Sequence, residues 1–96
     1  MADVNGVVID TQAIAAAGFL TVQPSTGQEW LIKNIFHADA VEYGTYDGSL
    51  AVAVDSDAGA GAWLSLSLFV TNADYIRVKN TTTSTQNIGY SGVRIV

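Results

Sequence analysis

The stretch Gln28–His37, QEWLIKNIFH, places large apolar residues on both faces of an alternating pattern. They divide as Trp30, Ile32 and Phe36 on one face and Leu31 and Ile35 on the other. A short segment that is apolar on both faces is typical of a strand in the middle of a sheet, covered from both sides. The cluster Pro24-Ser25-Thr26-Gly27 precedes it and predicts a turn. We therefore build the predicted fold outward from this strand.

The chain on either side of this strand alternates between apolar and polar residues at short spacing. We expect strands at Phe19–Gln23, Val41–Tyr46, Leu50–Asp55, Trp63–Val70, Tyr75–Asn80 and Ile88–Val96. The segment Trp63–Val70 alternates, and this predicts two faces. One face would carry Leu64, Leu66, Leu68 and Val70, and the other would carry Trp63, Ser65, Ser67 and Phe69. Asp47-Gly48 predicts a hairpin turn, and Gly89 or Gly92 is a candidate bulge.

These segments predict an all-β fold. Val, Ile and Thr make up more than a quarter of the 96 residues. No crossover helix separates the strands, so we expect an antiparallel β-sandwich, jelly-roll-like, with a small up-and-down barrel as the alternative. We expect one domain over residues 18–96. We expect residues 1–17 to form an N-terminal arm, either extended or with a short helix at Ile9–Ala17; the alternative is that they form the first strand of the sandwich.

The charge balance excludes several classes of function. Only 14% of the residues are charged, and nine acidic against four basic residues give a net charge of −5. Nucleic-acid binding needs clustered Lys and Arg, so we expect no nucleic-acid partner. No apolar run is long enough for a membrane-spanning helix, and Met1–Ala17 has no basic residue of the kind that opens a secretory signal. The chain has no cysteine, which excludes disulfides and thiolate chemistry.

Two groups of residues suggest chemistry, and each has a structural alternative. His37 and Asp39 would share a strand face, as an acid–base or metal pair needs, or would mark a strand end beside a turn. Asp55-Ser56-Asp57 is similar to the start of a calcium loop, but Ala60 and Leu66 stand where an EF-hand needs Gly and Glu. The alternatives are another type of calcium site or Asp side chains that accept backbone N–H groups. We expect no metal, no cofactor and no enzymatic activity.

Several aromatic residues offer a second binding hypothesis. They are Trp30, Tyr43, Tyr46, Trp63, Phe69, Tyr75 and Tyr90. Aromatic faces beside Asp and Asn can bind sugars, whereas the same residues on strands also pack into cores and interfaces.

Three motifs between Val22 and Thr82 show a resemblance to a known kind of protein. They are the turn PSTGQEW at 24–30, the hairpin YDG at 46–48 and the strand TNADYIRVKNT at 71–81. The segment resembles small β-sandwich virion proteins of tailed bacteriophages, which decorate heads or form head and tail appendages. The resemblance implies a structural, non-enzymatic role as a homo-oligomer, with a trimer favoured.

We therefore expect a capsid decoration, or cement, protein that binds the major capsid protein and stabilises the head. It would be made in the host cytoplasm and reside in the virion, without contact to a membrane. The alternative is a head-fibre or tail adhesin that binds host-surface glycans. For the interface with subunits or partners we expect the apolar residues of the arm and the aromatic side of the Trp63 strand: Val7, Val8, Ile9, Ile14, Trp63 and Phe69.

Overall fold

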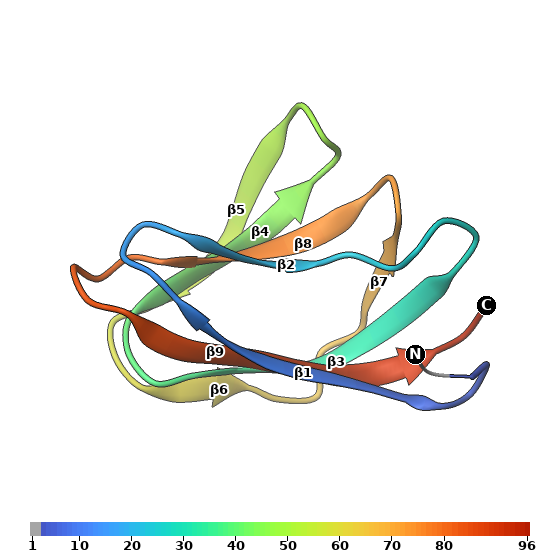
Figure 1. Ribbon diagram of the computed structural model, residues 1–96, viewed down its shortest axis with the longest axis horizontal. Helices are drawn as coiled ribbons and strands as arrows, with labels where there is room; N and C mark the ends of the chain where they lie inside the picture. Colours follow the sequence, from blue (N-terminus) through green and yellow to red (C-terminus); the bar gives the residue numbers. More distant parts are fainter. Residues whose placement is uncertain (1–2) are drawn as a thin grey trace.

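The computed structural model describes residues 3–96, which form two antiparallel β-sheets packed face to face as a β-sandwich (Figure 1). In chain order the strands are β1 (Val7–Ile14), β2 (Phe19–Val22), β3 (Glu29–His37), β4 (Val41–Tyr46), β5 (Ala51–Asp57), β6 (Gly61–Trp63), β7 (Leu68–Thr71), β8 (Tyr75–Asn80) and β9 (Gln86–Arg94). The prediction of an all-β antiparallel sandwich is confirmed. Residues 3–96 contain no helix that is long and apolar enough to cross a membrane.

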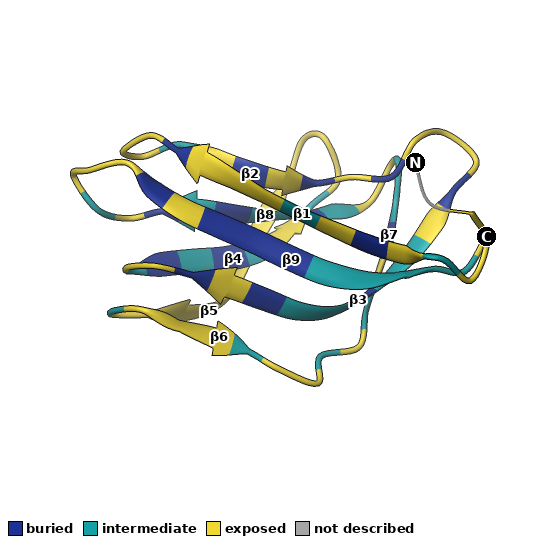
Figure 2. Ribbon diagram, turned by 60° about the horizontal axis from the view of Figure 1, so that its bottom comes forward, coloured by how far each residue is buried: buried dark blue, intermediate teal, exposed yellow. Residues whose placement is uncertain are grey.

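The two sheets differ in their strand order. Sheet A has the order β1-β9-β3-β6, with β7 also paired to β3, and sheet B has the order β2-β8-β4-β5. The edge strands β1 and β2 lie together at one side of the sandwich, and β5 and β6 lie at the other (Figure 2). Strand β3 is central in sheet A, as its sequence predicted.

The core lies between the two sheets and is made from alternate residues of each strand. In β8, Ile76, Val78 and Asn80 are buried, whereas the intervening residues are partly exposed, as the alternation predicted. The fully buried large side chains come from both sheets: Leu20, Ile32, Ile35, Ile88, Val22, Val41, Val70 and Val78. Burial of such aliphatic side chains is the main stabilising contribution in a small domain without disulfides.

The β4–β5 hairpin forms where Asp47-Gly48 predicted it. Oδ1 of Asp47 accepts hydrogen bonds from the backbone N–H groups of Ser49 at 2.9 Å and Leu50 at 2.7 Å. Gly48 has a φ of 92°, a conformation that is costly for residues with a Cβ atom. The turn therefore depends on both residues of the pair.

The helical alternative for the N-terminal arm is wrong. Residues Val7–Ile14 form strand β1, which pairs with β9 along its whole length, from Val7 opposite Val93 to Ile14 opposite Gln86. The strand position satisfies the backbone groups of this segment against β9, and this outweighs the helix preference of Ala13, while Ala16 and Ala17 lie in the turn before β2. Residues 1–2 of the predicted N-terminal arm lie outside the described residues.

A bulge in β3 changes which of its side chains face the core. The pairing with β9 shifts between Ile32 and Asn34, which leaves Lys33 as the extra residue. Ile35 therefore shares the buried side with Ile32, and Phe36 is partly exposed on the opposite face. The predicted grouping of Phe36 with Ile32 is wrong for this reason. The bulge lies beside Gly92 of β9, one of the two glycines that the sequence singled out.

The predicted continuous strand Trp63–Val70 is also wrong. Strand β6 ends at Trp63 and β7 begins at Leu68, and the residues between them cross over the bulge of β3. The N–H of Leu66 donates to the carbonyl of Lys33 at 2.8 Å, and Ser65 has a positive φ of 58°. The interruption turns Leu64 outward into solvent, whereas Leu66, Leu68 and Val70 pack against the core as predicted.

Candidate interaction surface

An apolar row crosses the outer face of sheet A. Val7 of β1 lies opposite Val93 of β9, and Leu31 of β3 lies opposite both Val93 and Phe69 of β7. Residues directly opposite each other in antiparallel strands point to the same face. The four side chains therefore form one continuous row, which we call the outer row: Val7, Val93, Leu31 and Phe69.

The two ends of the outer row are strongly exposed. Val7 is 72% exposed and Phe69 is 67% exposed, while Leu31 and Val93 between them are partly buried. Ile9, 68% exposed, extends the apolar surface along β1. A contiguous apolar patch on a folded subunit usually marks a contact with another protein.

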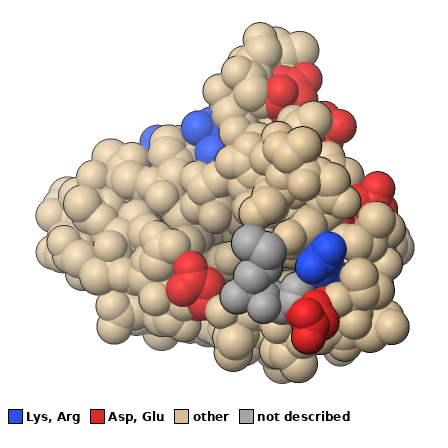
Figure 3. Space-filling view, turned by 45° about the vertical axis from the view of Figure 1, so that its right-hand side comes forward, with Lys and Arg blue, Asp and Glu red and all other residues tan. Residues whose placement is uncertain are grey.

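Charge is sparse on this face of sheet A. Among the paired residues of its strands, the register places Glu29 there, opposite Thr71 and beyond the row, and the bulge residue Lys33 adds a second charge, which donates to Oγ of Ser67 at 3.3 Å. Ser91 and Asn34 are the neighbours of Ile9 across the sheet. Figure 3, which views another side of the molecule, shows few charged groups on a largely uncharged surface. The outer face of sheet A can thus be covered without burying many ionic groups, which are costly to desolvate.

The residues predicted for an interface divide into two groups. Val7, Ile9 and Phe69 come together on the outer face of sheet A. Val8 and Ile14 point the other way and belong to the core of the subunit, because side chains alternate along β1. Trp63 also packs within the subunit, against the core.

Leu31 and Val93 are the members of the outer row that the sequence analysis missed. Leu31 is part of the segment that reads as apolar on both faces. That pattern indicated a cover on each side of β3, and within the subunit sheet B covers only the side of Ile32 and Ile35. The uncovered second face of β3 is the signal that could have identified Leu31, whereas no such signal marks Val93.

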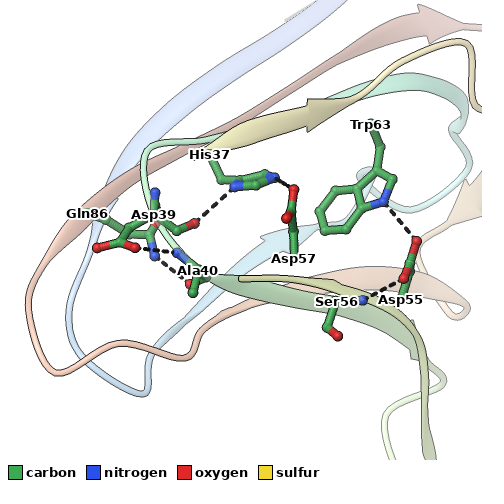
Figure 4. Close-up of polar contacts among 8 residues, drawn as sticks. All are labelled: His37, Asp39, Ala40, Asp55, Ser56, Asp57, Trp63 and Gln86. Carbon is green, nitrogen blue, oxygen red and sulfur yellow. Dashed lines mark hydrogen bonds and ion pairs between the residues drawn. The ribbon is translucent and has the colours of Figure 1, made fainter. Parts of the chain in front are cut away.

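Trp63 lies at the centre of a polar and aromatic cluster at the β5–β6 side (Figure 4). Its Nε1 donates to Oδ2 of Asp55 at 3.0 Å. Its ring lies 5.0 Å from that of His37 and 4.7 Å from that of Tyr43, between ring centroids. Burial, together with the nearby carboxylate of Asp55, raises the pKa of Tyr43 above its usual value. The cluster ties β5 and β6 to the sandwich.

His37 is held by two oxygen atoms. Its Nδ1 lies 2.9 Å from the carbonyl oxygen of Asp39, and its Nε2 lies 3.4 Å from Oδ2 of Asp57. The carboxylate of Asp39 instead accepts the N–H of Ala40 at 2.8 Å, so the geometry does not pair it with the imidazole. The side chain of His37 is fully buried, which leaves no access for a substrate.

The Asp55-Ser56-Asp57 segment binds groups of its own subunit. Oδ1 of Asp55 accepts the backbone N–H of Ser56 at 2.8 Å, and Asp57 faces His37. Among residues 3–96, no three His, Asp or Glu side chains come together as a metal site requires. The arrangement agrees with Asp side chains that accept backbone N–H groups.

A groove opens between the tip of the β4–β5 hairpin and β7. It has a volume of about 580 Å³, and its lining includes Tyr46, Leu50, Val52, Phe69 and Tyr75. The rings of Tyr46 and Tyr75 meet edge to face at 5.6 Å, and the guanidinium of Arg77 lies 3.7 Å from the centroid of Tyr46. Phe69 belongs to both the groove and the outer row.

A second hollow lies beside β1 and is lined in part by Trp30 and Tyr90, whose ring centroids are 6.2 Å apart. Burial and the carboxylate of Asp10 raise the pKa of Tyr90.

No protein-family model and no curated protein sequence matches the chain.

Proposed function

We propose that this protein is a structural component of a bacteriophage virion, a capsid decoration protein that binds the outer surface of the head and stabilises it. The outer row is the observation that carries the proposal. It presents apolar side chains from four strands on one face, with its ends exposed in the single subunit. A cement protein needs such a face to seat on capsid subunits.

The order of the strands supports a jelly-roll assignment. Each sheet interleaves strands from the two halves of the chain, as in β1-β9-β3-β6 and β2-β8-β4-β5. With β6 and β7 sharing the place beside β3 in sheet A, the two strand orders follow the jelly-roll pattern, which viral capsid and lectin domains both use. The resemblance of the 24–30, 46–48 and 71–81 motifs to phage virion proteins adds to this support.

In the proposed mechanism, each subunit bridges neighbouring capsid subunits through the outer face of sheet A. A stable protein contact takes about 800 Å² from each partner, and a contact smaller than that is weak alone. An oligomer that binds at several points raises the effective concentration of each further contact, so modest contacts together resist the pressure of packaged DNA. The trimer implied by the resemblance would supply three such points.

The groove favours a second candidate, the glycan-binding adhesin. It combines the aromatic side chains of Tyr46, Phe69 and Tyr75 with the carboxylates of Asp47 and Asp74. Its volume falls within the range of small-ligand sites. Most of the remaining lining is aliphatic (Leu50, Val52, Leu68 and Ile76), and this weakens the case for a polar sugar.

Binding to phage heads tests the first proposal. When purified heads that were assembled without this protein are mixed with it and sedimented, the protein should be found in the pellet. Ile9→Lys should reduce the fraction bound to the heads at least tenfold. Thr83→Lys, in the exposed loop after β8, adds the same charge elsewhere and should bind normally. Equal binding of both variants, or reproducible binding to a glycan array without binding to heads, would count against the decoration role.

A further inference from the structure

Strand β5 is exposed along its whole length. All seven of its residues are exposed, and in sheet B it has a single strand neighbour, β4, among the described residues (Figure 2). Its other edge therefore presents unpaired backbone N–H and C=O groups to a further strand. Leu50, Val52 and Val54 are 73%, 64% and 51% exposed, which adds apolar surface beside this edge.

The N-terminal half of β5 lacks most of the features that prevent an edge strand from pairing with another strand. Natural edge strands are usually protected by Lys, Pro, bulges or inward-pointing charges. The segment Ala51–Asp57 contains no Lys and no Pro. The bulge and the charges lie in its second half: the pairing with β4 shifts at Val54, and Asp55 and Asp57 contact groups of their own subunit. Residues 50–53 remain uncharged and regular.

We propose that two copies of this chain pair antiparallel through β5, around a twofold axis at Val52. In this register Val52 lies opposite Val52 of the second copy and Ala51 lies opposite Ala53, so these paired residues all precede the shift at Val54. None of them carries a carboxylate. A parallel, in-register pairing would instead set Asp55 against Asp55, which is unfavourable for like charges. The charge pattern thus selects a second copy in the antiparallel orientation.

The groove enlarges this contact. Its lining includes Leu50 and Val52, the same exposed side chains that lie beside the free edge of β5. One strand pair alone buries less than the roughly 800 Å² per partner of a standard interface, so the groove residues contribute the remaining area. The second copy covers its partner's groove, and the twofold axis makes the two contacts equal.

This contact goes beyond the proposed capsid role, because it uses β5 and not the outer face of sheet A. A twofold contact joins chains in pairs. In solution it gives a dimer, or a hexamer if a trimer also forms. On a head it links neighbouring oligomers, while the outer row remains free for the capsid.

Disulfide trapping tests the register directly, because the natural chain has no cysteine. Opposed residues in antiparallel strands have Cα atoms about 4.5 to 5.5 Å apart, within the range that a disulfide bridges. Val52→Cys should oxidise to a covalent dimer at micromolar concentration. Val7→Cys, which is equally accessible on sheet A, should remain largely monomeric on a denaturing gel.

Mass measurement gives an independent readout. Light scattering should find an even multiple of the 10.1 kDa chain, and Val52→Lys should halve that mass. Ile9→Lys should leave it unchanged, which separates this contact from head binding. A monomer at all concentrations, a mass unaffected by Val52→Lys, or equal crosslinking of both cysteine variants would overturn the β5 pairing.

Discussion

Val7 and Phe69 stand at the two ends of one cross-strand row, although they are far apart in the sequence. Val93 and Leu31 lie between them, and the register of three strand pairs connects all four residues. This relationship brings the first strand and the interrupted β6–β7 region onto one face. It also shows why the outer face of sheet A, and not the Trp63 cluster, is the better candidate for binding.

The alternation in β1 predicts that the same substitution at two neighbouring valines changes the free energy of unfolding by very different amounts. Val7→Thr should change the free energy of unfolding by no more than about 0.5 kcal/mol, since Val7 is exposed. Val8→Thr has the same shape change but places a hydroxyl in the core, and should cost about 1–3 kcal/mol. Urea denaturation of both variants measures the difference. Equal costs would contradict the assigned faces of β1.

Trp63 should contribute to the stability of the subunit and not to its assembly. Trp63→Ala removes the ring that packs against His37 and Tyr43, and should destabilise by about 3 kcal/mol. Trp63→Phe keeps an aromatic ring but loses the hydrogen bond to Asp55, and should cost about 1 kcal/mol. Thermal unfolding gives the two values. An unchanged melting temperature with a lower oligomer mass would assign Trp63 to an interface instead.

Asn80 is the buried polar residue whose loss should be most damaging. Its Nδ2 donates to the carbonyls of Ile14 at 2.9 Å and Ser84 at 2.7 Å, and its Oδ1 accepts from Nε2 of Gln86 at 2.9 Å. Asn80→Asp replaces the donor with an oxygen that faces these carbonyls, and should cost about 3 kcal/mol or more. The exposed Asn87→Asp provides the matched control, and equal urea midpoints for the two would refute this role.

Alkaline pH should destabilise the fold through two tyrosines. Burial, with Asp55 and Asp10 as the secondary causes, raises the pKa of Tyr43 and Tyr90 in the folded state. A raised folded pKa means that the stabilisation is complete below about pH 10 and is lost as the pH rises through the folded values. The double variant Tyr43→Phe, Tyr90→Phe should lose less stability between neutral pH and pH 11 in urea titrations. Parallel losses in both proteins would argue against this account.

Acid should loosen the tip of the β4–β5 hairpin. The backbone N–H groups of Leu50 and Ser49 lower the pKa of Asp47, so its contribution is present above the ordinary carboxyl pKa and is lost as the pH falls through the folded value. Asp47→Ala should remove hydrogen-exchange protection from these two amides at every pH, whereas Asp47→Asn keeps one acceptor and should retain part of it. Protection that is independent of the Asp47 side chain would contradict the prediction.

The sequence by itself determined the class of fold and most of its strands. The alternation of Tyr75–Asn80 and the Asp47-Gly48 turn are local signals, because side-chain period and turn geometry depend on residues close together in the chain. The same reasoning placed Val7, Ile9 and Phe69 among the candidate interface residues.

Only the tertiary structure decided which faces these residues occupy. The bulge at Lys33 turned Phe36 outward and interrupted the strand after Trp63, and pairing with β9 made Val7–Ile14 a strand. Bulges and strand partners depend on contacts between distant segments, which no local pattern encodes. The same long-range pairing joined Val7 to Phe69 and left β5 with a free edge, and so produced both surfaces on which the proposed assembly depends.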